Sequence, residues 1–373
     1  MTTRREVLKF GAGTAALAVG AHTLGLDPAI AQVPAKIVIA RLPINTIHTL
    51  YMGAGDWFKE EGLTVEYFMS PAGPAVVQAL ASGSVPVGEI GTGPAMISAA
   101  RKLPFISPAL GAVGTPKNPW QRIMVRKDSP IKTARDLKGK KVAVVQRGTM
   151  SDLETIAMGK THGVGLDDIE LALVPAPNMP QVLEQGQVDA IWALPPFDTV
   201  AERRFGARTI LNDSDIIPYV GYGTLTFRSD FVDAYPEAAK KIMKVWMRLA
   251  RWIDDNQAKA NATAGKAIGV DEDLWPHLRV PYFARNALPV MPNVWHMYHL
   301  LVAGKILPPH DNPEKLIEET VIAPTRKITL PALQELGVQP DPEIVSMLRA
   351  SYPMLPKPTE AYYADWERKL VQR

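Results

Sequence analysis

Residues 83–95, which read GSVPVGEIGTGPA, decide the fold. Gly83 stops the preceding helical pattern, and the run Val85–Ile90 has the length and apolar character of a buried strand. Gly91-Thr92-Gly93 reads as a tight loop. Pro94 is suited to open a helix, because the N–H it lacks would have no partner there. A buried strand, a glycine turn and a helix in succession are the repeating unit of a largely parallel α/β sheet.

The same alternation extends outward from this stretch in both directions. Strands are predicted over Lys36–Ala40, Leu63–Met69, Val85–Ile90, Phe105–Ala112, Trp120–Val125, Lys141–Val145, Glu170–Val174, Val188–Ala193, Arg208–Leu211 and Tyr219–Phe227. Helices are predicted over Ile47–Glu61, Pro74–Ser82, Met150–His162, Met179–Gln185 and Glu237–Asn256. The sequence from Asp271 to Arg373 is predominantly helical in pattern and rich in proline.

The order of these elements predicts an α/β fold of two lobes with a hinge between them. One α/β unit runs through residues 34–118, a second through 119–219, and the chain then returns to the first lobe over 220–310. Residues 311–373 form a helical C-terminal extension. Two crossings require two connecting strands, expected near Pro119–Arg126 and Tyr219–Phe227. Such lobes can rotate about a hinge, with a ligand cleft between them.

The N-terminal segment reads as an export signal over residues 1–31. Residues 3–9, TRREVLK, resemble the twin-arginine motif, and cleavage is expected near Ala31. The alternative is a transmembrane helix over Phe10–Leu26, but that stretch is at the short limit for a bilayer and is interrupted by glycines. With no cysteine in the chain, a lipid anchor, disulfides and cysteine nucleophiles are excluded. We expect a protein that is free in the periplasm.

Composition excludes several functional classes. A net charge of +3 is too small to indicate a nucleic-acid surface. The chain carries no phosphate-binding loop, dinucleotide fingerprint or nucleophile elbow, so we expect a non-enzyme without a cofactor. His296 and His299 share one helical face, which is a metal-ligand spacing, but packing is favoured because no carboxylate cluster accompanies them. No metal site is therefore predicted.

Candidate ligand residues lie where predicted strands end, since ligands of open α/β sheets bind beyond the carboxyl ends of strands. The start of the helix at Met150 offers free N–H groups to an anion, and Arg147 can add a two-pronged contact. The alternatives are a capped helix with a solvated arginine and, at Gly91–Gly93, a tight turn with nothing bound. The candidate set is Arg41, Asn45, His48, Ala72, Gly73, Glu89, Gly91, Thr92, Gly93, Arg147, Gly148, Thr149, Met150, Trp192, Phe197 and Tyr222.

Three of these candidates carry an open question. Trp192 and Phe197 could stack on a flat ligand or merely pack within a lobe. Glu89 conflicts with an anionic ligand: if its carboxylate faces the cleft, an amine or a pyrimidine would suit the site better.

Three stretches carry a resemblance to a known family: residues 83–95, residues 131–144 (IKTARDLKGKKVAV) and residues 186–197 (GQVDAIWALPPF). With the return helix over Phe231–Asn256, they resemble the periplasmic solute-binding proteins of the nitrate, sulfonate and taurine importers. That group has NMT1-like members and relatives that bind thiamine precursors. Pro86 departs from the family pattern, which often has an aspartate there, and the resemblance fades beyond about Pro308.

The resemblance implies a type II periplasmic binding protein fold and an ABC permease with ATPase subunits as partners. It implies capture of a small solute, which we expect to be an anionic sulfonate, nitrate or carboxylate. We expect the protein to be a monomer. Alternatives are a ligand-sensing partner of a membrane receptor and a binder of a pyrimidine or thiamine precursor. A thiamine-pyrimidine synthase is excluded by the lack of cysteine. A transcription-regulator effector domain is excluded because the N-terminus is an export signal and not a DNA-binding motif.

Overall fold

The computed structural model describes residues 33–44, 48–70, 73–352 and 354–355. These residues belong to one compact unit that begins at Val33. The predicted signal peptide with its cleavage site near Ala31 lies outside the described residues, as do Asn45, Ala72 and residues 356–373. In the described part of the chain, no helix combines the length and apolar character needed to cross a membrane.

The first sheet has five strands in the order β2-β1-β3-β12-β4. Its first three strands are parallel, and β12 runs antiparallel to both of its neighbours, β3 and β4. The parallel part is built by consecutive strand–helix units, whereas β12 is contributed by the chain on its return. The strands are β1 (Ile37–Arg41), β2 (Val65–Met69), β3 (Val87–Ile90), β4 (Phe105–Ile106) and β12 (Thr224–Arg228).

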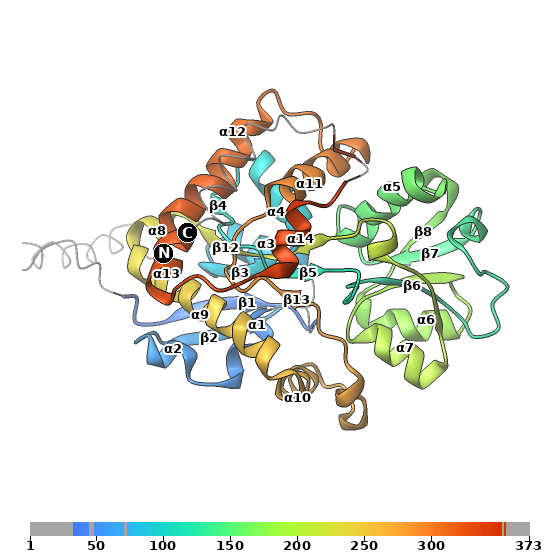
Figure 1. Ribbon diagram of the computed structural model, residues 1–373, viewed down its shortest axis with the longest axis horizontal. Helices are drawn as coiled ribbons and strands as arrows, with labels where there is room; N and C mark the ends of the chain where they lie inside the picture. Colours follow the sequence, from blue (N-terminus) through green and yellow to red (C-terminus); the bar gives the residue numbers. More distant parts are fainter. Residues whose placement is uncertain (1–32, 45–47, 71–72, 353, 356–373) are drawn as a thin grey trace, which may run out of the picture. The chain divides into compact units, whose positions relative to one another are not determined.

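The second sheet repeats this plan in the order β10-β6-β9-β7-β8. β7 is parallel to β8 and to β9, and β6 runs antiparallel to β9 and β10. Figure 1 shows α5 on one face of this sheet and α6 and α7 on the other. The strands are β6 (Arg122–Val125), β7 (Lys141–Val144), β8 (Glu170–Leu173), β9 (Ala190–Ala193) and β10 (Arg208–Asn212).

A three-stranded connecting sheet lies where the chain passes from one five-stranded sheet to the other. It is formed by β5 (Ala112–Gly114), β11 (Val220–Tyr222) and β13 (Tyr282–Phe283), in the order β11-β5-β13. Antiparallel β5 and β11 form the two-strand connection. β11 falls within the connecting strand predicted over Tyr219–Phe227, but the other prediction, near Pro119–Arg126, was wrong: the strand there is β6 of the second sheet, and β5 precedes it. β13 adds a third strand that was not predicted, because a two-residue strand leaves no period to read.

The helices fill the connections between strands. Those in the first part are α1 (His48–Tyr51), α2 (Trp57–Glu60), α3 (Gly73–Ala81) and α4 (Thr92–Ala100). Those accompanying the second sheet are α5 (Met150–His162), α6 (Met179–Glu184) and α7 (Phe197–Phe205). After the return come α8 (Ser229–Ala234), α9 (Pro236–Asp255), α10 (Gln257–Ile268), α11 (Met291–Ala303), α12 (Pro313–Ile317), α13 (Leu330–Leu336) and α14 (Pro342–Leu348).

Several helices and strands are shorter than predicted, because the chain divides them. The helix predicted over Ile47–Glu61 is split into α1, a 3-10 turn over Met52–Ala54 and α2. The strand predicted over Phe105–Ala112 is two strands in two different sheets, because Pro108 between them has no N–H to give to a ladder. The strand predicted over Tyr219–Phe227 is likewise divided, at Gly223, whose φ of +67° turns the chain from the connecting sheet into the first sheet.

The C-terminal extension packs on the first sheet and the connecting sheet. A continuous helical run from α12 to α13 includes two π-helical stretches, and the hydroxyls of Thr325 and Thr329 donate to the carbonyl of Pro108. This run occupies the edge beyond β4 (Figure 1). α14 then places Ile344 and Met347 in an apolar cluster with residues of the connecting sheet. Residues 311–352 of the extension are thus an integral part of the fold.

Candidate ligand site between the two sheets

The loop that follows β3 is the first predicted ligand loop. Gly91 is the N-cap of α4, and the hydroxyl of Thr92 donates to the carbonyl of Gly221 over 2.8 Å. Gly93 leaves no room for a side chain, since a Cβ there would stand 2.5 Å from the carbonyl oxygen of Gly148. Gly148 belongs to the second predicted loop, between β7 and α5. The structure therefore brings these two loops, from two different sheets, into direct contact.

The β7–α5 loop already holds a carboxylate supplied by the chain. Asp152, in the first turn of α5, accepts hydrogen bonds from the N–H of Gly148 at 2.8 Å and from Nε of Arg147 at 3.1 Å. Burial raises the pKa of the Asp152 carboxyl, and these two donors oppose the rise. Thr149 turns its hydroxyl to a backbone carbonyl 2.6 Å away, and Met150 is buried. The anion expected at this helix start competes with Asp152 for the same donors.

Arg41, at the end of β1, is half-buried. Its guanidinium lies over the ring of Tyr67, 4.3 Å from the centroid, and its Nη1 donates to a carbonyl of α1 over 3.4 Å. Burial lowers the pKa of Arg41. Gly73 is the first residue of α3 and is partly buried. Asn45 and Ala72 lie outside the described residues, so their ligand role stays a prediction.

Glu89 lies in β3, is fully buried, and contacts the first residues of α1. Its Oε2 accepts a hydrogen bond from the N–H of Thr49 over 3.0 Å. Its Oε1 stands 3.9 Å from Nδ1 of His48, which is longer than a hydrogen bond. The His48 ring stacks on Trp246 with the centroids 3.8 Å apart and meets Phe283 edge-on at 4.2 Å. Burial lowers the pKa of His48 and Glu89 opposes this, so the imidazole is neutral at pH 7.

Residues His48, Thr49 and Glu89, here called the Glu89 group, have polar atoms without a hydrogen bond. Four buried atoms of this group have no such partner among the described residues: Oε1 of Glu89, both ring nitrogens of His48 and the hydroxyl of Thr49. Buried polar atoms are nearly always satisfied in folded proteins, because each one left without a partner costs about 1–3 kcal/mol. Four unpartnered polar atoms at one place therefore indicate a site for a polar ligand.

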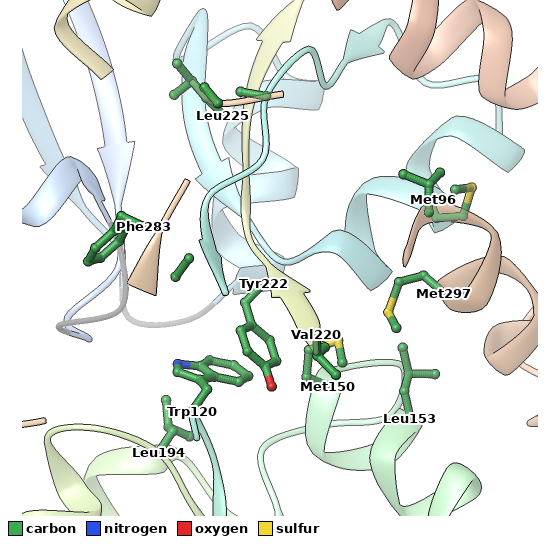
Figure 2. Packing of buried hydrophobic residues seen from close by; sticks show 14 of the residues in the cluster. Met96, Trp120, Met150, Leu153, Leu194, Val220, Tyr222, Leu225, Phe283 and Met297 are labelled. Atoms are coloured by element: carbon green, nitrogen blue, oxygen red, sulfur yellow. The ribbon is translucent and has the colours of Figure 1, made fainter. Parts of the chain in front are cut away.

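The three aromatic candidates occupy different settings. Trp192 is fully buried in β9, and its Nε1 donates to the hydroxyl of Thr155 in α5 over 2.9 Å. This placement favours lobe packing over ligand stacking for Trp192. Phe197, the first residue of α7, is also buried. Tyr222 packs against Trp120 with the ring centroids 3.6 Å apart and the ring planes tilted by 36°, and Figure 2 shows the two rings side by side at the connection between the sheets.

The hydroxyl of Tyr222 lies between two buried carboxyl groups, neither of which is among the candidate residues predicted from the sequence. Oε1 of Glu154, from α5, is 3.0 Å away, and Oδ2 of Asp213 makes a shorter contact with the same hydroxyl. Oδ2 of Asp213 also accepts the N–H groups of Trp120 and Gln121, each over 3.0 Å. Residues Glu154, Asp213 and Tyr222 are here called the Tyr222 group.

The Tyr222 group requires one extra proton. A phenol has a single proton, so it can bond to both carboxyl groups only if one of them donates to it. Asp213, which accepts backbone N–H groups, is suited to carry the charge, and Glu154 to carry the proton. Burial raises the pKa of Asp213 to about 6, and burial together with the charge of Asp213 raises the pKa of Glu154 well above its ordinary value.

Of the residues that were missed, only one had a local signal. Thr149-x-x-Asp152 has the spacing of a capping box, in which the acidic residue reaches back to N–H groups at the helix start. Glu154 and Asp213 are far apart in the sequence and meet only because α5 packs beside the second crossing. No local pattern could have predicted that pair.

Two cavities border this region. One of about 40 Å³ lies beneath α4 and is lined mainly by apolar side chains, with Thr92 and Asn293 among its polar members. The other, of about 290 Å³, lies beside the first crossing and is lined by Lys117, Arg279 and Asp254, among others. Neither of these two cavities is lined by the Glu89 group, which is covered in this state.

The described residues contain no group of three or more His, Asp or Glu side chains arranged to hold a metal ion. Both His296 and His299 lie on α11. His296 is buried with its ring centroid 4.8 Å from that of Tyr352, and burial lowers its pKa to about 3.

Two α/β sheets, crossed twice by the chain and joined at loops that open helices, define the periplasmic binding protein fold. The nitrate-binding protein NrtA of Synechocystis shares this fold, with a TM-score of 0.68 at 15% identity over 86% of this chain and 92% of that one. So does the desulfurization enzyme DSZB, with a TM-score of 0.55 at 16% identity over 81% and 99% of the two chains. The fold therefore hosts binding proteins and an enzyme, and function must be argued from the site.

The chain belongs to the NMT1-like family, whose model matches residues 34–268. It is also similar to the taurine-binding periplasmic protein of Escherichia coli, with 26% identity over 189 residues. That match covers 50% of this chain and 56% of the relative. The matched stretch thus spans little more than half the length of this curated relative. The family confirms the resemblance found in residues 83–95, 131–144 and 186–197.

Proposed function

We propose that the chain is the substrate-binding component of an ABC importer. It captures a small solute with a sulfonate, nitrate or carboxylate group between two lobes, formed by residues 34–118 with 220–310 and by residues 119–219. It then delivers the solute, chemically unchanged, to permease and ATPase subunits at the inner membrane. The chain acts as a monomer in the periplasm, after export by the twin-arginine signal.

The observation that carries this proposal is the meeting of Gly93 and Gly148. Each belongs to a loop that opens a helix, one beside the first sheet and one beside the second, and the two loops touch where the sheets face each other. A solute held there would contact both lobes at once, so its binding would favour the state in which the lobes are together. The strands of each sheet fall within the proposed lobes, and the chain passes between the sheets twice.

The relatives support the same class of function. The Escherichia coli relative is named as a taurine-binding periplasmic protein and the Synechocystis structure as a periplasmic nitrate-binding protein. Both are named as binding proteins and not as enzymes. Absence of chemical turnover is part of the proposal, because the fold is also that of DSZB.

A thermal-shift screen of the chain from residue 32 onward tests the proposal. The panel contains taurine, ethanesulfonate, nitrate, benzoate and a hydroxymethylpyrimidine, each at millimolar concentration. A ligand that binds only the folded state stabilises it by mass action and so raises the melting temperature. At one hundred times its Kd, the free energy of unfolding rises by about 2.7 kcal/mol. We expect a shift with at least one member and mass spectrometry showing that this ligand is recovered unaltered. A chemically changed ligand, or no shift with any member, would contradict the proposal.

A further inference from the structure

We propose that the Glu89 carboxylate binds a protonated amine of the solute, so that the protein selects an amine-bearing, zwitterionic ligand over an anion of the same size. This inference rests on the proposed function and gives its ligand class. Glu89 is then the residue that determines specificity at the first lobe, whereas the helix starts of α4 and α5 receive the anionic end.

Glu89 has a buried carboxylate oxygen that accepts no hydrogen bond from the described residues. Oε1 of Glu89 has no hydrogen-bond partner in the described part of the chain, although the side chain is fully buried. Its other oxygen is held by the N–H of Thr49. Thr49 Oγ1 and one nitrogen of the His48 ring are also without a partner and can accept further hydrogen bonds, while the other ring nitrogen is a donor. An ammonium has three donors and no acceptor, so it can satisfy the three acceptors of this set.

The Glu89 carboxylate also lacks a cationic partner among the described residues. In the described part of the chain no lysine or arginine forms an ion pair or hydrogen bond with Glu89, and Arg41 directs Nη1 to a backbone carbonyl of α1 instead. An ionised carboxylate that is buried without a cation is strongly unfavourable. A cation brought by the ligand removes this penalty, while an acceptor-only anion such as nitrate adds like-charge repulsion.

The surroundings of the Glu89 group are apolar. The rings of Trp246 and Phe283 border His48 at 3.8 and 4.2 Å and exclude water from the Glu89 group. An ion pair is stronger in such a medium than in water. Gly223 at the turn between β11 and β12 comes close to Oε1, since a Cβ there would stand 3.3 Å away. The Glu89 group therefore adjoins the second crossing of the chain, at the turn from β11 to β12.

Calorimetric titration with two isosteric ligands tests this inference. Taurine has an ammonium where isethionate has a neutral hydroxyl, and both carry the same sulfonate. For the wild-type chain we expect isethionate to bind at least tenfold more weakly than taurine. In Glu89→Gln the carboxylate charge is removed while the size is kept, so the ratio of the two Kd values should fall to about two or less. Glu184→Gln, at an exposed site, is the matched control and should keep the wild-type ratio.

The outcomes separate this inference from the proposed function. Equal affinity for taurine and isethionate in the wild type, or a ratio unchanged by Glu89→Gln, overturns the amine assignment and leaves the proposed function standing. The same holds if nitrate or ethanesulfonate binds and no amine-bearing sulfonate does. If no member of the panel binds, both fail. Should Glu89→Gln not fold, the comparison of taurine with isethionate on the wild type decides alone.

Discussion

The Glu89 group and the Tyr222 group are both built on buried carboxyl groups, yet their hydrogen bonding is opposite. Four donor or acceptor atoms of the Glu89 group lack partners in the described part of the chain. In the Tyr222 group, Asp213 accepts from Tyr222, Trp120, Gln121 and Ser214, and Glu154 accepts from Gln121. One cluster is incomplete without a guest, whereas the other is completed by the protein.

This contrast assigns different roles to similar residues. The completed cluster ties α5 to β11 and to both crossing segments, so it holds the two sheets in the state described here. By the proposal above, the unsatisfied atoms of the incomplete cluster destabilise the empty protein, and a ligand that supplies the missing partners restores that stability. A buried carboxylate alone is therefore a poor indicator of a binding site, and its unsatisfied atoms are the better one.

The largest expected effect comes from removing the acceptor of the completed cluster. Asp213→Ala leaves the N–H groups of Trp120 and Gln121 and the hydroxyl of Tyr222 without their acceptor, so we expect a loss of about 3–5 kcal/mol in the free energy of unfolding. Glu89→Gln should change it by less than about 1 kcal/mol, because only one N–H depends on that carboxylate. Urea denaturation of both variants measures the difference. If both variants lost the same free energy of unfolding, the two groups would not differ in how far the protein satisfies their hydrogen bonds.

The next effect is a dependence of stability on pH. The pKa values of Asp213 and Glu154 are raised in the folded state, so the folded chain keeps a proton that the unfolded chain releases. Their contribution is complete below about pH 4 and is lost as the pH rises through about 6 and above. The groups that hydrogen-bond to them are Tyr222, Gln121 and backbone N–H groups, and their pKa shifts have no contribution from a lysine or arginine.

We therefore expect the free energy of unfolding to fall by about 2–3 kcal/mol between pH 5 and pH 8. Glu154→Gln, which mimics the protonated acid, should flatten this slope, while Glu89→Gln should leave it in place. Urea melts of the three proteins at four pH values measure the slopes. A slope that survives in Glu154→Gln would show that the shared proton is not in the Tyr222 group.

A smaller effect tests how tightly the completed cluster is packed. A Cβ at Gly114 would stand 2.9 Å from both Oδ2 of Asp213 and the hydroxyl of Tyr222. Gly114→Ala should therefore cost about 1–2 kcal/mol of stability. Gly73→Ala, at a helix start where a Cβ meets nothing within 4 Å, is the control and should be neutral or slightly stabilising. Equal stability of the two variants in thermal melts would contradict the packing described.

The smallest effect concerns the other end of the ligand. Arg147 is half exposed and paired with Asp152, so its charge is largely compensated. Arg147→Ala should weaken taurine and isethionate alike, by about 1 kcal/mol. Calorimetry that shows a selective loss for taurine would mean that Arg147, and not Glu89, discriminates between the two ligands.

The sequence predicted the architecture better than the site. Repeated strand–helix units with glycine stops made both sheets predictable, because the period and the stops are local. β13 was missed because a strand of two residues shows no period. The single strand predicted over Phe105–Ala112 was wrong because Pro108 has no N–H to donate to a neighbouring strand. The predicted loops at Gly93 and Gly148 do meet. Asp152 and the Tyr222 group depend on long-range packing, and only the capping-box spacing at Thr149 gave any warning of them.

The role of Glu89 can be tested by a crystal structure of the chain with the ligand that gives the largest thermal shift. We expect a ligand nitrogen about 2.7–3.2 Å from Oε1 of Glu89, with the hydroxyl of Tyr222 still bonded to Glu154 and Asp213. A ligand that leaves Oε1 of Glu89 empty, or that enters by displacing the bonds of Tyr222, would contradict it.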